Sequence, residues 1–84
     1  MIIQLFINDA EQVQGLINEA HGIMLLQSGV YCAQALAINN LANVYGLKED
    51  FEAAGVTAPN QVKLISCEEW VELCATHYPV VTIQ

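Results

Sequence analysis

Two segments of this chain run from an apolar strand directly into the start of a helix, and they constrain the fold more than any other feature. They are Gly22–Tyr31, with the sequence GIMLLQSGVY, and Val44–Val56, with the sequence VYGLKEDFEAAGV. The second segment also has a glycine, Gly55, at the position where a helix is expected to end. Tandem units of this kind predict a parallel sheet covered by helices, with functional groups at the turns where strands lead into helices.

The rest of the chain continues this alternation. Apolar runs predict strands at residues 1–7, 23–27, 41–47, 62–66 and 80–83. Helices are expected between them, from Asn8 to about residue 20, then at about 29–38, 48–54 and 67–77. Two capping boxes are expected, Asn8 with Glu11 and Ser66 with Glu69, and Ser28 is expected to cap the second helix. We therefore expect residues 1–84 to form a single α/β domain, a small Rossmann-like three-layer fold with a mainly parallel five-stranded sheet and helices on both faces.

The composition favours a protein that binds other proteins. Hydrophobic residues make up 55% of the 84 residues and charged residues only 13%, so a small domain would expose apolar patches of the kind that mark partner surfaces. The net charge is −7, with no arginine and with Lys48 and Lys63 against nine acidic residues. Because a direct grip on RNA or DNA needs clustered Lys and Arg, we expect no direct binding of nucleic acid.

The sequence also predicts a cytoplasmic location. The first apolar run, Ile2–Ile7, is too short and is broken by Gln4, so we expect neither a signal peptide nor a membrane span. The three cysteines, Cys32, Cys67 and Cys74, form no CxxC pair, which indicates free thiols in a reducing compartment.

Cys32 is the candidate catalytic residue, because it lies close to the start of the second helix, where the helix dipole can lower the pKa of a thiol. It could serve as a nucleophile or carry sulfur, or it could be a small residue that packs in an Ala-rich helix. Packing is the expected role of Cys67 and Cys74. The two histidines, His21 and His77, share no ligand spacing with the cysteines, and no glycine-rich phosphate loop is present, so we expect no metal and no cofactor.

Three stretches of the chain resemble the DsrE/DsrF/DsrH superfamily, specifically its TusB/DsrH-like branch. They are Leu25–Tyr31 (LLQSGVY), Val44–Val56 and the final segment Ile65–Val80, in the same order as in that branch. The resemblance implies a cytoplasmic sulfur-relay complex in which this chain joins TusC- and TusD-like, or DsrE- and DsrF-like, subunits. Such complexes pass persulfide sulfur toward 2-thiouridine at the tRNA wobble position, or act in intracellular sulfur oxidation.

The resemblance also implies where a sulfur-carrying cysteine would lie, at the end of the third strand. That place falls on Gly46 or Leu47, and neither is a cysteine. Cys32 occupies a position where the branch commonly has alanine, so the resemblance gives it no role. We therefore expect a non-catalytic subunit of the relay that serves 2-thiolation of the tRNA wobble uridine. Three alternatives remain open: a DsrH-like subunit in intracellular sulfur oxidation, a sulfurtransferase with Cys32 as its persulfide carrier, and a stand-alone homo-oligomeric domain with a small-molecule pocket at the strand-to-helix turns.

Overall fold

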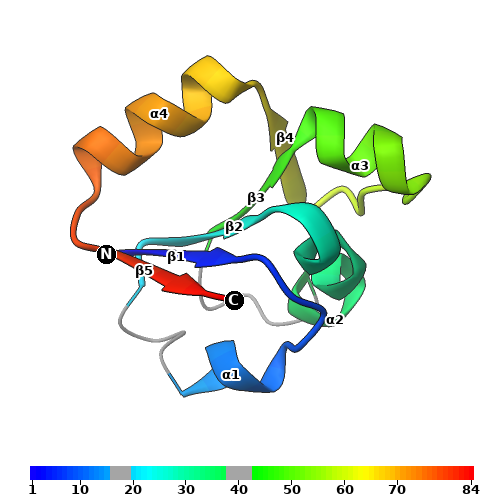
Figure 1. Cartoon of the computed structure of the whole chain (residues 1–84), viewed down its shortest axis with the longest axis horizontal. Coiled ribbons are helices and arrows are strands. Elements are labelled where there is room, and N and C mark those ends of the chain that lie inside the picture. The colour runs from blue at the N-terminus through cyan, green and yellow to red at the C-terminus, as the bar shows by residue number, and fades with distance from the viewer. Residues whose placement is uncertain (16–19, 38–42) are drawn as a thin grey trace.

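A five-stranded parallel sheet forms the centre of the protein (Figure 1). The computed structural model describes residues 1–15, 20–37 and 43–84. Every neighbouring pair of strands is parallel, and the strand order is β4-β3-β2-β1-β5. The predicted fold class is therefore confirmed. The strands are β1 (Ile2–Leu5), β2 (Gly22–Leu25), β3 (Asn43–Leu47), β4 (Val62–Ile65) and β5 (Val80–Ile83).

The strand order decides which face each helix covers. The chain steps from β1 through β2 and β3 to β4 in one direction, then returns past them to place β5 beside β1. Right-handed crossovers put the first three connections on one face of the sheet and the last on the other. Figure 1 shows α4 on one side of the sheet and α1 and α2 on the opposite side. The helices are α1 (Glu11–Gln14), the 3-10 helix η1 (Gln27–Cys32), α2 (Ala33–Ala37), α3 (Lys48–Ala54) and α4 (Cys67–Thr76).

The two faces of the sheet carry cores of different size. The core on the side of α1, α2 and α3 contains twelve buried residues, including Ile3, Leu36 and Phe51. The core under α4 contains five: Ile2, Met24, Leu26, Leu47 and Ile65. Alternation of side chains along each strand produces this division, since Ile2 and Ile3 point to opposite faces. The face under α4 is thus the more thinly covered one.

Several predicted elements are found where the sequence places them. The strand at Val80–Ile83 and the helix at Lys48–Ala54 have the predicted bounds, and Gly55 takes the left-handed conformation with φ 69°. The capping box at Ser66 is confirmed: the hydroxyl of Ser66 accepts the N–H of Glu69, and the carboxylate of Glu69 accepts the N–H of Ser66, both at 3.2 Å. Together these contacts fix the start of α4 directly after β4.

Other predicted boundaries are wrong. The capping box at Asn8 does not form, because α1 begins one residue after Ala10 and the carboxylate of Asp9 accepts the N–H of Glu11 instead, at 3.2 Å. Ser28 caps no helix, because the 3-10 helix already starts at Gln27 and has no side-chain cap. The predicted helix positions 16–19 and 38 and the strand positions 41 and 42 lie outside the described residues. None of the described helices has the length and apolarity needed to cross a membrane.

Candidate functional site

The carboxyl ends of the strands form the candidate site, because open parallel sheets bind ligands at that edge. The chain leaves β3 toward α3 on one face, whereas it leaves neighbouring β4 toward α4 on the other face. Adjacent strands whose connections diverge in this way create a crevice at the sheet edge. The turn after β2, which leads into η1, lies at the same edge.

The turn after β2 is held in an unusual conformation. Gln27 has a positive φ of 50°, a conformation that costs a non-glycine residue on the order of 1–3 kcal/mol. Its N–H donates to Oδ2 of Asp50 at 2.8 Å, so the first turn of α3 fastens the end of β2. Gly29 lies against β1, where an added Cβ would come within 2.9 Å of the Leu5 carbonyl carbon and nearer still to its oxygen. Gly29 therefore allows the backbone of this turn to contact the backbone of β1 at Leu5.

A shallow hollow of about 260 Å³ lies between this turn and α3. Its polar groups are the Ser28 hydroxyl, the Gln27 side chain and the Asp50 carboxylate, and the Tyr31 ring stands at its edge with 55% of its surface exposed. Its lining residues, Gln27, Ser28, Tyr31, Asp50, Ala53 and Ala54, include no cysteine, histidine or lysine. The hollow can therefore hold a hydrogen-bonding or cationic group, but its lining offers no thiol to carry sulfur.

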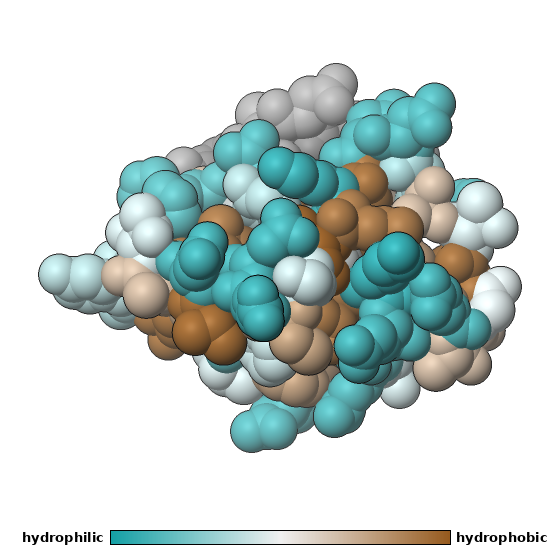
Figure 2. All heavy atoms as spheres, turned by 90° about the horizontal axis from the view of Figure 1, so that it is seen from above, coloured by the Kyte–Doolittle hydropathy of each residue, from teal (hydrophilic) through white to brown (hydrophobic). Residues whose placement is uncertain are grey.

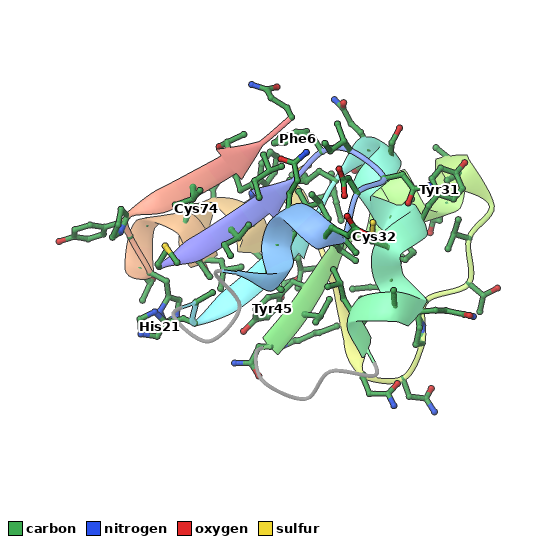
Figure 3. The ribbon with its side chains drawn as sticks, turned by 90° about the horizontal axis from the view of Figure 1, so that it is seen from below. Phe6, His21, Tyr31, Cys32, Tyr45 and Cys74 are labelled. Carbon is green, nitrogen blue, oxygen red and sulfur yellow. The ribbon has the colours of Figure 1, made fainter. Side chains whose placement is uncertain are left out.

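Cys32, the candidate sulfur carrier, lies inside the protein at the end of η1 (Figure 3). Only 3% of its surface is exposed, and its thiol donates to Oδ1 of Asn8 at 3.3 Å. Burial raises the pKa of this thiol; the Asp9 backbone N–H lowers the pKa and the Asp9 charge raises it. The thiol is consequently protonated at neutral pH, which disfavours nucleophilic attack. Persulfide transfer through Cys32 stays a prediction, and it requires the buried thiol to become accessible.

Gly46 and Leu47, at the end of β3, are enclosed by apolar side chains. A Cβ at residue 46 would lie 2.9 Å from Cδ1 of Phe51 and nearer still to Cε1, which is closer than real Cβ atoms pack. Leu47 is 7% exposed and belongs to the core under α4 with Leu26 and Ile65. The position that the family resemblance assigns to a sulfur-carrying cysteine thus lies among closely packed apolar side chains.

A family model described as "DsrH like protein" matches residues 6–80. The chain belongs to the DsrH-like family. The match extends over both strand-to-helix turns and nearly all of the described fold, so the predicted membership of this sulfur-relay family is confirmed. A comparison with curated proteins gave no match.

The other two cysteines of this DsrH-like chain lie apart from Cys32. All three are free; Cys67 is exposed at the first residue of α4, and Cys74 is half-buried on the same helix. The Cys74 thiol lies 3.8 Å from Oε1 of Gln4, and burial raises its pKa, partly offset by a hydrogen bond with Trp70. Within the described ranges, no group of three or more His, Cys, Asp and Glu residues could hold a metal ion.

The sequence treats His21 and His77 as unrelated, but the structure brings them together. Their ring centroids are 5.2 Å apart, with the planes tilted by 31°. His21 directly precedes β2 and His77 follows α4, so both lie at the amino-terminal edge of the sheet, opposite the candidate site. No spacing rule could predict this pair, because it depends on where the crossover from β4 to β5 passes the sheet. The sequence does not predict the Asp50–Gln27 hydrogen bond either, because it also joins residues far apart in the chain.

Proposed function

We propose that this DsrH-like protein is a non-catalytic subunit of a cytoplasmic sulfur-relay complex. Its partners are DsrE- and DsrF-like, or TusC- and TusD-like, subunits, one of which carries the sulfur on a cysteine. The complex serves 2-thiolation of the tRNA wobble uridine. The observation that carries the proposal is the end of β3, where Gly46 packs against Phe51 and Leu47 is buried.

Sulfur transfer needs a thiolate that can reach a donor persulfide and then an acceptor. Residues 46 and 47, at the candidate edge, supply no thiol. Cys32, which follows the turn after β2 at the same edge, is buried and its thiol has a raised pKa. What the edge does supply is a shaped surface with an exposed tyrosine and an acidic group. These features suit a subunit that supports the cysteine of a partner.

The charge of the chain supports the same division of labour. With Lys48 and Lys63 as the only Lys or Arg residues and a net charge of −7, the chain repels a phosphate backbone. A partner subunit must therefore hold the tRNA.

Reconstitution tests the accessory role. The chain is mixed with DsrE- and DsrF-like subunits from the same organism, a cysteine desulfurase and labelled cysteine, and the label is followed by intact-mass measurement. We expect sulfur on the DsrE-like subunit and none on this chain. A variant with Cys32→Ala should assemble and support transfer as well as the wild type, with Cys67→Ser as a matched thiol-loss control. Loss of transfer in the assembled Cys32→Ala complex alone would establish Cys32 as the carrier and refute the proposal.

A second measurement addresses the acceptor. Cells that lack this chain should contain less 2-thiouridine in the wobble position of their tRNA, as measured by mass spectrometry of digested tRNA. Unchanged 2-thiouridine together with impaired oxidation of stored sulfur would assign the complex to sulfur oxidation instead.

A further inference from the structure

Helix α4 covers its face of the sheet incompletely. None of its ten residues is fully buried, and the side chains that it turns toward the sheet, such as Trp70 and Leu73, are only partly buried. Hollows of about 240 Å³ and about 400 Å³ lie beside it. Figure 2, which views the protein from the side where α4 lies in Figure 1, shows hydrophobic surface exposed between hydrophilic side chains.

The larger hollow is apolar although a glutamine lies at its base. Oε1 of Gln4 accepts the indole N–H of Trp70 at 2.8 Å, and Nε2 of Gln4 donates to the Thr82 hydroxyl at 3.1 Å. The amide is therefore already hydrogen-bonded on both sides. The remaining lining consists of Trp70, Val71, Cys74 and Val80, and Val71 is 66% exposed. A hollow of this kind suits an apolar side chain better than a polar ligand.

The hollow is continuous with the edge of the sheet, because Val80 lines it and begins β5. The carbonyls of Pro79 and Ile83 face β1, since they accept the N–H groups of Ile2 and Phe6. Backbone groups alternate along a strand, so Val80 and Thr82 turn their N–H and C=O groups away from β1. Proteins usually protect such an edge with lysine or proline, but Val80–Ile83 contains neither. The opposite edge strand, β4, carries Lys63.

The charges around this surface indicate what covers it. Helix α4 carries Glu68, Glu69 and Glu72. Glu69 and Glu72 line the smaller hollow together with Lys63, whereas Glu68 precedes Val71 by three residues and is its neighbour on the helix surface, beside the larger hollow. A second copy of this chain would bring a further net charge of −7 and only two lysines. A partner with Lys or Arg beside an apolar side chain matches Glu68, the negative net charge of the chain and the hollow together.

We infer that Gln4, Trp70, Val71, Cys74, Val80 and Thr82 form the docking surface for a partner protein that inserts an apolar side chain beside α4 and surrounds it with basic residues. We call these six residues the α4–β5 surface. The inference rests on the proposed function, because it identifies the surface by which this chain joins its complex.

Binding to the purified DsrE- and DsrF-like subunits tests the inference, measured by calorimetry with the full chain. Val71→Lys replaces an apolar contact with a cation that repels the basic residues of the partner. It should weaken binding by about 30-fold or more, as loss of a hot-spot residue does. Ala35→Lys is the matched control: it makes the same charge change at an exposed helical position of α2, on the other face of the sheet. We expect the control to bind within about 3-fold of the wild type, because isolated surface changes have small effects.

A salt series adds a second readout that does not depend on a large substitution. Raising NaCl from about 50 mM to about 300 mM should weaken binding of the wild type more than binding of Glu68→Gln, because screening removes an attraction that the variant has partly lost. Thermal melts establish that each variant is folded, and Thr82→Lys at the β5 edge replaces Val71→Lys if the latter does not fold.

The outcomes separate the two proposals. If the wild type binds the subunits and Val71→Lys binds equally well, the α4–β5 surface is refuted while the proposed function stands. If the wild type does not bind them and sedimentation shows a dimer that Val71→Lys dissociates, the occupant is a second copy and the inference is wrong. A wild type that neither binds nor dimerises refutes both proposals.

Discussion

Substitution of Gly46 by alanine should destabilise the protein, although alanine normally stabilises a strand relative to glycine. Gly46 lies in β3 and does not have the positive φ that favours glycine; among the described glycines, Gly55 has it. On backbone grounds alone, the change would add about 0.4–1 kcal/mol to the free energy of unfolding by restricting the unfolded chain.

Packing against Phe51 reverses this sign. The new methyl carbon would lie 2.9 Å from Cδ1 and 3.0 Å from Cζ of the ring, and nearer still to Cε1, whereas ordinary contacts begin at 3.4 Å. Phe51 is 2% exposed and belongs to the larger core, so the ring cannot retreat into solvent. Overpacking of a filled core costs about 1–3 kcal/mol. The net loss should be about 0.5–2 kcal/mol, which for a domain of this size lowers Tm by about 4–8 °C for each kcal/mol.

Urea unfolding of Gly46→Ala, Phe51→Leu and the double variant measures the effect. Phe51→Leu removes the ring atoms that the methyl group would meet, so the double variant should be more stable than the sum of the two single losses predicts. An increase in the stability of Gly46→Ala, or strictly additive losses in the double variant, would show that the ring does not close this position. The result bears on function, because a cysteine at residue 46 would meet the same ring.

Four further predictions concern the hydrogen bonds and the thiols. Trp70→Phe removes the N–H that Gln4 accepts and should lower the free energy of unfolding by about 1–2 kcal/mol, seen as a lower urea midpoint; an unchanged midpoint would contradict the role of Gln4. Ser66→Ala removes the α4 cap and should cost about 1 kcal/mol, whereas Ser66→Asp should restore most of it. Burial raises the pKa of Cys32 and Cys74 above the ordinary 9.0, so the unfolded chain loses these protons first and stability should fall as pH rises above about 9. Cys32→Ala should reduce that fall, and iodoacetamide at pH 8 should label exposed Cys67 well before Cys32, as peptide mass spectrometry can measure.

The sequence predicts the parallel sheet well because each strand is mostly apolar, with at most one polar residue such as Gln4 in β1 or Lys63 in β4, as largely covered strands require. Local chemistry also locates α4, whose start is fixed by the reciprocal Ser66–Glu69 bonds within four residues. Where two nearby residues compete for the same role, prediction fails: Asp9, and not Asn8, binds the first turn of α1. A sequence pattern cannot decide between such neighbours, because the choice depends on how the chain leaves β1.

The candidate site is less predictable than the fold, because its contacts join distant parts of the chain. The left-handed Gln27 depends on Asp50, which is 23 residues further on. The enclosure of Gly46 depends on where the Phe51 ring points, and the exposure of Cys32 depends on how η1 lies against the loop after β1. The helical position of Cys32 is consistent with both a reactive and a packed thiol, and only its burial distinguishes them.

The place of β5 in the sheet has a consequence for when the protein becomes able to assemble. This strand is synthesised after the other four described strands, yet it pairs with β1, the first of them. A nascent chain that lacks residues 80–83 leaves one edge of β1 without its neighbour and cannot form the α4–β5 surface. Pairing over so long a separation is slow compared with local contacts. If partners dock on this surface as we infer, they would bind only chains whose synthesis has passed β5, and shortened products would be left out of the complex.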